Sequence, residues 1–434
     1  MSATTELVIR GGTVIDATGT RRADVRVVDG AVVEVAEGLD APKRAVTLDA
    51  AGCVVAPGLV DLHTHLREPG REEAETVESG TRAAALGGFT AVVAMPNTDP
   101  PLDSAESVRN VYALAEGAMA QVAVAGAITV GRAGERLAPM AELAALGVRL
   151  FTDDGDGVQS AGLMRRALQY ATGLGVTLAQ HCEDRSLADG GTMHEGAWSS
   201  RLGLPGMPSE AEEVMVARDI ALARATGGRV HFLHLSTAGS VDLVRRARAD
   251  GVPVTAEVAP HHFTLTDGCV AGYDPVFKVN PPLRPRPDVD AVQAALADGT
   301  ADAIATDHAP HAPEQKDLPF DQAPPGMLGL QTALALAVTE LDLPLERLLA
   351  LLSWQPAAIA GLDPAHGGSQ GAPVVPGSAA NLCVIDPTAT WTVDPTALAS
   401  RSRNTPYAGR TLTGRVRHTV RAGEPVVIDA EAQR

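Results

Sequence analysis

Several features that mark other protein classes are missing from this 434-residue sequence. No stretch approaches the length of a membrane span, and the opening "MSATTELVIRGG" has neither a basic leader nor an apolar secretory run. The four cysteines (53, 182, 269 and 383) lie far apart and form no CxxC pair. We therefore expect a reducing, cytoplasmic location without a disulfide framework.

Positive charge is also scarce relative to negative charge, because the formal net charge is -18. Such an excess repels nucleic acid and anionic membrane surfaces, so we expect neither as a partner. The composition, with 45% hydrophobic and 20% charged residues, is that of an ordinary globular protein. The length allows one or two domains.

The two ends of the chain are rich in short β-branched runs separated by glycine. Examples are "LVIRGGTVID" and "ADVRVVDGAVVEVA" near the start, and "AANLCVIDP" and "RVRHTVRAGEPVVID" near the end. The pair Asp29-Gly30 between two such runs predicts a two-residue hairpin turn. We predict a small β-sandwich domain built from residues 1–56 and 371–434, around a central domain of residues 57–370. Two independent decorations are the alternative.

The central part alternates short apolar strands with amphipathic helical segments such as 76–88 and 236–251. Eight strands are expected, in "GLVDLHTH", "TAVVAMPNT", "QVAVAGAIT", "VRLFTDDG", "VTLAQHCED", "VHFLHLST", "VPVTAEVAPHH" and "ADAIATDHAP". Buried parallel strands read as near-continuous apolar runs, and eight βα units predict a closed (β/α)8 barrel of the TIM type. An open doubly wound sheet is the alternative, but no GxGxxG follows the first strand.

Residues able to bind a metal stand where these strands end, which is where barrel enzymes carry their active sites. They are His63, His65, Asp153, Asp154, His181, His234, Asp307 and His308. Each alone also fits a capping aspartate or a core histidine bonded to a carbonyl. Together, four histidines and two carboxylates suffice for two metal ions that share one carboxylate. Such a centre generates a nucleophile near neutral pH and polarises a carbonyl, which indicates hydrolysis, or its reverse, of an amide-like bond.

The sequence resembles class I dihydroorotase, within the amidohydrolase superfamily, over essentially its whole length. The most specific stretches are "VDLHTHLREPG", "GGFTAVVAMPNTDP", "FTDDGDGVQ", "AQHCED", "HFLHLSTAGS", "TAEVAPHH", "FKVNPPLR" and "IATDHAPH". The resemblance implies a zinc-dependent barrel with a small β-sandwich domain. It also implies reversible closure of N-carbamoyl-L-aspartate to L-dihydroorotate, the third step of pyrimidine (UMP) synthesis.

The resemblance further implies a role for each matching residue, and two zinc ions per chain. The implied metal ligands are His63, His65, Asp154, His181, His234 and Asp307, with Asp154 as the bridge rather than Asp153. Asp307 would also be the catalytic proton shuttle. The implied substrate-binding residues are His65, Arg67, Asn97, Asn280, His311 and the backbone around Pro325 and Gly326. A guanidinium such as that of Arg67 suits a substrate carboxylate through its planar donor fork.

One departure from the family is Pro325, where an aromatic residue is common, which puts the ring contacts and the loop motion there in doubt. We expect His261 and His262 to form pocket wall and His308 to support its neighbours. The stretch 308–326 is expected to be a mobile loop over the site or a plain surface loop.

Two rival functions stay open at this point. Hydantoinases and allantoinases usually bridge their metals with a carboxylated lysine on the fourth strand, and "VRLFTDDG" contains none. An inactive structural partner of aspartate carbamoyltransferase would have lost a ligand, and none is missing. Association with that transferase is compatible with activity, and a homo-oligomer, a dimer, is expected.

Overall fold

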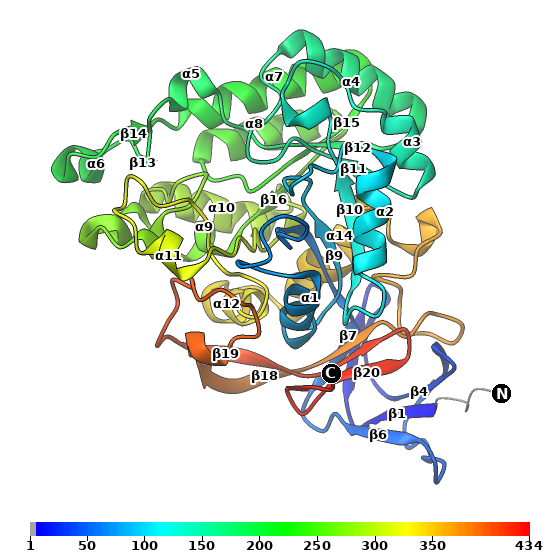
Figure 1. Ribbon diagram of the computed structural model, residues 1–434. Coiled ribbons are helices and arrows are strands. Elements are labelled where there is room, and N and C mark those ends of the chain that lie inside the picture. The colour runs from blue at the N-terminus through cyan, green and yellow to red at the C-terminus, as the bar shows by residue number, and fades with distance from the viewer. Residues whose placement is uncertain (1–5) are drawn as a thin grey trace.

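Eight parallel strands form a barrel at the centre of the computed structural model (Figure 1), which describes residues 6–434. They follow one another around the barrel in chain order: β8 (Leu59–Thr64), β9 (Phe89–Ala94), β10 (Gln121–Gly126), β11 (Leu150–Phe151), β12 (Thr177–Gln180), β15 (Arg229–Phe232), β16 (Val254–Val258) and β17 (Ala303–Ile304). A parallel bridge between Thr64 and His308 brings the last strand back to the first. The predicted barrel is confirmed, and the open doubly wound sheet is wrong.

Helices surround the barrel, and some of them begin after a residue whose side chain caps the first turn. They include α1 (Val77–Leu86), α2 (Ala105–Leu114), α3 (Met140–Ala145), α4 (Ala161–Leu174), α7 (Glu210–Thr226), α8 (Ala238–Ala249), α10 (Arg286–Asp298) and α12 (Ala333–Glu340). The predicted segments 76–88 and 236–251 contain α1 and α8. Each of these two helices follows a threonine, Thr76 or Thr237, whose side chain accepts a hydrogen bond from a backbone N–H of the first turn.

One unit between β12 and β15 departs from the strand–helix alternation. It consists of α5 (Arg185–Ala188), β13 (Met193–His194), α6 (Ala197–Leu202) and β14 (Gly206–Met207). In Figure 1 it extends outward from the barrel, and Met193 packs with Val270 and Phe320 in a small core of its own. The sequence did not predict this unit, because strands of two residues are too short to show alternation.

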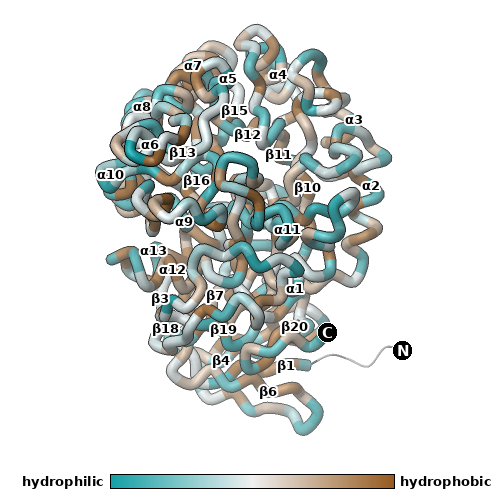
Figure 2. The backbone as a smooth tube through the Cα atoms, turned by 60° about the vertical axis from the view of Figure 1, so that its left-hand side comes forward, coloured by the Kyte–Doolittle hydropathy of each residue, from teal (hydrophilic) through white to brown (hydrophobic). Residues whose placement is uncertain are grey.

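The interior of the barrel is a packed apolar core. Leu62, Val93 and Leu150 point into it from β8, β9 and β11, and Leu233 joins them just beyond β15; all four are at most 2% exposed. A larger apolar layer separates the strands from the helices. Most of the polar residues named in the sequence analysis lie at or just beyond the strand ends, and the chain around α11 (Pro313–Lys316) is largely hydrophilic (Figure 2).

Both ends of the chain build a two-sheet β domain below the barrel (Figure 1). One sheet has the order β5 (Ala31–Ala36), β4 (Asp24–Val28), β1 (Glu6–Arg10) and β6 (Val46–Asp49). The other has the order β21 (Glu431–Ala432), β20 (Glu424–Ile428), β19 (Thr411–Arg421), β18 (Leu382–Thr392), β7 (Val54–Pro57), β2 (Thr13–Asp16) and β3 (Gly19–Arg22). β18 pairs with β7, which joins the C-terminal part to the N-terminal part. The predicted β domain from both termini is confirmed, as is the Asp29-Gly30 turn between β4 and β5.

Residues 1–5 lie outside the described residues. They include the start of the predicted N-terminal part of the β domain and of the opening segment "MSATTELVIRGG". Within residues 6–434, no helix is both long enough and apolar enough to cross a membrane. The boundaries after residues 56 and 370 stay predictions.

Segment 398–407, between β18 and β19, leaves the β domain and packs against barrel loops. There Ser402 Oγ donates to Ala74 O (2.7 Å).

Candidate active site

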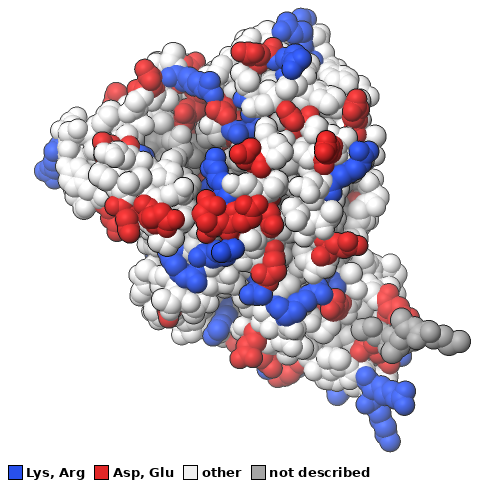
Figure 3. All heavy atoms as spheres, viewed as in Figure 1, with Lys and Arg blue, Asp and Glu red and all other residues white. Residues whose placement is uncertain are grey.

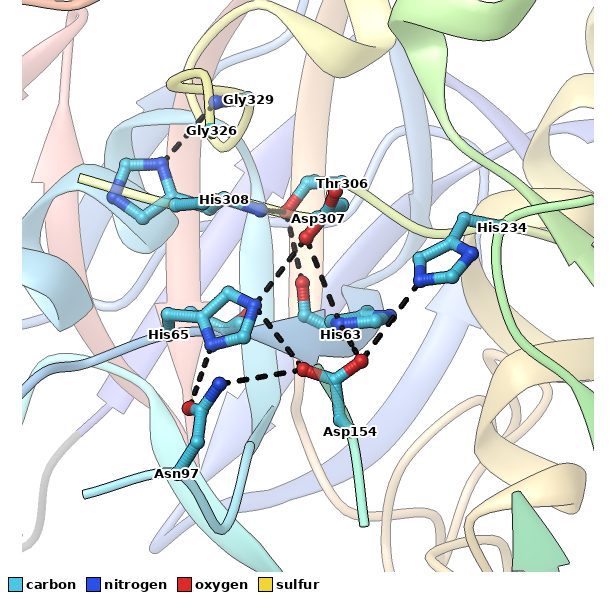
Figure 4. A network of polar contacts seen from close by, with 12 residues as sticks. His63, His65, Asn97, Asp154, His234, Thr306, Asp307, His308, Gly326 and Gly329 are labelled. Carbon is cyan, nitrogen blue, oxygen red and sulfur yellow. Dashed lines mark hydrogen bonds and ion pairs between the residues drawn. The ribbon is translucent and has the colours of Figure 1, made fainter. Parts of the chain in front are cut away.

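A pocket of about 230 Å³ opens at the carboxyl ends of the barrel strands. It is lined by all the predicted site residues except His63, namely His65, Arg67, Asn97, Asp154, His181, His234, Asn280, Asp307, His311, Pro325 and Gly326. His63 is fully buried beside the pocket, and Figure 4 shows its ring turned toward Asp154 and Asp307. The structure thus brings together residues from most strands of the barrel.

Two histidines from the end of β8 each keep one ring nitrogen free for the centre of the site. His63 Nδ1 donates to Glu257 Oε1 (2.9 Å), and His65 Nδ1 donates to Asn97 Oδ1 (2.9 Å). In the neutral rings the Nε2 atoms are therefore unprotonated, yet they lie 3.6 and 3.3 Å from Asp307 Oδ1. Lone pairs and a carboxylate this close repel one another unless a cation lies between them, which is the arrangement of a metal site.

Asp154 lies at the middle of the histidine cluster (Figure 4). Its carboxylate oxygens are 3.4 Å from His63 Nε2, 3.6 Å from His65 Nε2, 3.5 Å from His181 Nδ1 and 3.8 Å from His234 Nε2. Ligand atoms of His63, His65 and Asp307, and again of His63, Asp154 and His234, fall within 4.8 Å of one another. His63 is common to these two groups, and the Asp154 carboxylate lies within 3.8 Å of nitrogens from His63 and His65 on one side and from His181 and His234 on the other.

Asp153, the neighbouring carboxylate, binds the chain that follows β10 instead of the histidines. It accepts hydrogen bonds from Ile128 N (2.9 Å) and Thr129 N (3.0 Å), and also from the Thr129 hydroxyl. Its carboxylate therefore faces away from the histidines.

The electrostatics of the cluster favour positive charge at its centre. Burial opposes ionisation of Asp154, but His63, His181 and His234 outweigh it and hold the pKa of that carboxyl well below its usual value. Burial likewise disfavours a charged His181, yet Asp154 and Glu183 raise its pKa to about 10. A site whose carboxylates draw protons onto imidazoles is one that attracts cations, and its N and O donors suit zinc.

Arg67 supplies an anion-binding group on the other side of the pocket. Its Nε donates to Pro310 O (3.1 Å), and its terminal nitrogens have no protein acceptor within residues 6–434. Burial, together with Arg71 nearby, lowers the pKa of Arg67 to about 10, so it stays cationic at neutral pH. β8 ends at Thr64, so Arg67 reaches the pocket through a left-handed backbone (φ 62°) rather than through strand alternation.

The loop that carries His311 and Gly326 is folded tightly over the pocket. His311 Nε2 donates to Pro325 O (2.8 Å), and burial, followed by Arg67, lowers the pKa of His311 to about 3. Gly326 has φ 145°, and a Cβ there would stand 2.8 Å from His311 Nε2, so this close approach requires glycine. The backbone N–H of Gly326 donates to Lys278 O (2.9 Å), which leaves carbonyl lone pairs for a ligand there.

Three other histidines named in the sequence analysis stand behind the site. His308 Nε2 is 3.2 Å from Glu75 Oε2, and Figure 4 shows its ring turned away from Asp154. His262 Nε2 donates to Pro281 O (3.0 Å), and His261 Nε2 lies 3.8 Å from Asp307 Oδ2. None of the three lines the pocket, so their roles as supporting or wall residues stay predictions.

The sequence analysis missed several polar residues that hold the site together. Glu257 on β16 accepts hydrogen bonds from His63 Nδ1 and from His231 Nε2 (3.0 Å). Glu183 lies 3.5 Å from His181 Nε2 and accepts from Asn280 Nδ2 (2.6 Å). A lone carboxylate in a buried apolar strand is unusual, so "TAEVAP" held a signal for Glu257.

The rest of the described surface offers no comparable cluster of metal ligands. A larger hollow of about 430 Å³ between α12 and the β18–β19 hairpin contains no histidine. On the face seen in Figure 3, acidic and basic side chains are interspersed rather than gathered into one large patch.

Comparison with known proteins agrees with this site. Residues 52–240 match the Dihydro-orotase-like family. The chain is 50% identical to a dihydroorotase of Pelotomaculum thermopropionicum, covering 98% of this chain and 99% of the relative. It is 48% identical to one of Mycobacterium tuberculosis, over 94% and 96% of the two chains. Among solved structures, an L-hydantoinase from Arthrobacter aurescens matches with a TM-score of 0.86 and 24% identity, over 99% and 97% of the two chains. The likeness to the hydantoinase structure shows the shared fold alone.

Proposed function

The chain belongs to the dihydroorotase family of cyclic amide hydrolases in the amidohydrolase superfamily, and from this premise we propose the reaction and the residue roles given below. The reaction is the reversible closure of N-carbamoyl-L-aspartate to L-dihydroorotate with release of water. The observation that carries this substrate is Arg67, a buried guanidinium with free terminal nitrogens in the same pocket as the histidine–aspartate cluster. Dihydroorotate has a ring carboxylate for it, whereas hydantoin has none.

Two zinc ions per chain are the proposed cofactors. His63, His65 and Asp307 would hold one, His181 and His234 the other, and Asp154 would bridge them. The convergence of histidine nitrogens and carboxylate oxygens supports this assignment. Metal ions in such a centre lower the pKa of water and polarise a carbonyl oxygen.

The protein's own residues would bind the substrate and move the proton. Arg67 would pair with the ring carboxylate. Asn97 Nδ2 donates one hydrogen to Asp154 Oδ2 (3.4 Å), and its second hydrogen would bind the same substrate carboxylate. His311 would join them by turning its Nε2–H from Pro325 O to the substrate. In hydrolysis Asp307 would accept a proton from the attacking water and deliver it to the leaving ring nitrogen, and the reverse in synthesis.

Asn280 and the loop backbone would contact the ring itself. Asn280 Nδ2 already donates to Glu183, so its Oδ1 is the group offered to a ring N–H. Pro325 and Gly326 would contribute carbonyl lone pairs and an apolar surface, because the Gly326 N–H is engaged by Lys278.

The test is a substrate comparison with the purified, zinc-loaded chain. L-dihydroorotate, hydantoin and allantoin are supplied separately, with and without aspartate carbamoyltransferase. We expect turnover of dihydroorotate far above that of the other two. Preference for hydantoin or allantoin would contradict the substrate, and a complete lack of activity with bound metal would favour a structural partner of the transferase.

Assembly and location are proposed from the family resemblance. We propose a homodimer that associates with aspartate carbamoyltransferase, and a cytoplasmic location, which the four unpaired cysteines support. Light scattering of the chain with and without the transferase tests the first two proposals.

A further inference from the structure

One buried asparagine ties the two ends of the pocket loop together from outside the barrel. Asn404 lies between β18 and β19, in segment 398–407, and is 5% exposed. Its Nδ2 donates to Ala309 O (2.9 Å) and to Gly326 O (3.1 Å). Its Oδ1 accepts from His311 N (3.2 Å).

All three partners of this side chain line the substrate pocket, whereas Asn404 itself does not. Backbone hydrogen bonds also hold the two ends of the loop. Leu328 N donates to Asn404 O (3.1 Å), and Ala309 N donates to Met327 O (2.8 Å). The Asn404 carboxamide therefore adds three hydrogen bonds to those that the two ends of the loop make with each other. The far part of the loop is held separately by Lys316 Nζ, which donates to Pro324 O (2.8 Å).

Only a carboxamide fits this position. It must donate two hydrogen bonds to carbonyls and accept one from an N–H, and an aspartate of the same shape has no N–H to donate. An aspartate would place a carboxylate against two carbonyl oxygens, and an alanine would leave three buried backbone groups without a partner.

We propose that Asn404 is a positioning residue for the substrate, through which the C-terminal part of the chain completes the active site. It sets the distance between His311 and Gly326, and with it the place of the substrate carboxylate and ring. This inference rests on the proposed function. It assigns Asn404 no contact with substrate or metal, so its loss acts on substrate binding more than on the chemical step.

The experiment compares Asn404→Asp and Asn404→Ala with matched changes at Asn381. Asn381 is equally buried, at 5% exposure, and binds backbone in the β domain, with Nδ2 donating to Ser369 O (3.1 Å) and Oδ1 accepting from Ala422 N (2.8 Å). Hydrogen exchange of residues 309–327, metal content, and KM and kcat for dihydroorotate are measured for every variant.

We expect both Asn404 variants to exchange faster in residues 309–327 and to raise KM by about tenfold, because the loop loses two hydrogen bonds in Asn404→Asp and three in Asn404→Ala. Metal content should be unchanged and kcat should fall by less than about threefold. The Asn381 variants should lower the melting temperature without either effect. Normal exchange in both Asn404 variants, an unchanged KM, or the same effects in the Asn381 variants would overturn the proposal. If the wild-type enzyme does not turn over dihydroorotate, the proposed function fails, and the exchange measurement alone decides whether Asn404 holds the loop.

Discussion

Two adjacent aspartates offer the sharpest test of the metal centre, because they differ only in the direction they face. Asp154 lies within 3.8 Å of nitrogens from four histidines, whereas Asp153 binds the backbone of residues 128 and 129. The substitutions Asp154→Ala and Asp153→Ala remove the same atoms from neighbouring positions. We expect opposite effects on metal binding and on stability.

Asp154→Ala removes the carboxylate that we propose both metal ions share. Loss of a residue that only orients a ligand typically weakens metal binding by about 10–100-fold, so loss of the bridge should weaken it by at least about a hundredfold. The bridging carboxylate also offsets the repulsion between two cations, so both sites should lose metal together. Dialysed protein should then hold well under one metal ion per chain.

Asp153→Ala should keep its metal and lose stability. It leaves two buried backbone N–H groups and a hydroxyl without their acceptor, which should lower the free energy of unfolding by about 3 kcal/mol. The assay is metal content per chain after identical dialysis, together with urea unfolding. If Asp153→Ala loses metal and Asp154→Ala does not, the bridge is assigned to the wrong residue. Reconstitution of the wild-type apoprotein should be indifferent to bicarbonate; a requirement for it would indicate a carboxylated lysine instead.

Three further predictions concern the surroundings of the centre. Arg67→Met should keep both metals but lower kcat/KM for dihydroorotate about a hundredfold, as loss of about 2–3 kcal/mol implies; unchanged kcat/KM would exclude the carboxylate contact. Glu257→Gln should weaken metal binding about 10–100-fold by disturbing His63, while Glu75→Gln, at a buried carboxylate bound to His308, should not; equal losses would make the effect one of general packing. Burial, then the charge of Lys278, lowers the pKa of Lys316 to about 7, so between pH 7 and 10 the unfolded chain holds a proton that the folded lysine has lost. Stability relative to Lys316→Met should therefore rise with pH over that range, by up to about 1.4 kcal/mol per pH unit, and parallel unfolding curves would refute this.

The sequence was enough to predict the barrel and the positions of its polar residues, because both follow from local patterns. Apolar runs of four to six residues mark buried strands, and side chains beyond the last apolar residue must leave the core at the same end of the barrel. The resemblance to the family distinguished Asp154 from Asp153, and the structure shows the two facing opposite ways.

Residues that act through partners far away in the chain could not be predicted in this way. Glu257 meets His63 across 194 residues, and Asn404 meets His311 across 93. No local period records such pairs, because they depend on how the barrel closes and on how segment 398–407 returns to it. Arg67 shows a milder form of the same limit, since its position was predicted but its left-handed backbone was not.

The same division explains why the chain shares its fold with hydantoinases while its sequence groups it with dihydroorotases. The apolar interior of the barrel fixes where the strand ends lie, and any cyclic amide can be presented to a histidine–aspartate cluster placed there. Cyclic amides differ in ring size and in the substituents on the ring. In this chain the groups proposed to contact those features lie beyond the strands. Arg67 follows β8 in an irregular segment, and His311 and Gly326 belong to a loop whose shape depends on Asn404. Substrate choice can therefore change through loop residues and their supports while the barrel stays the same, so the fold by itself does not identify the substrate of this chain.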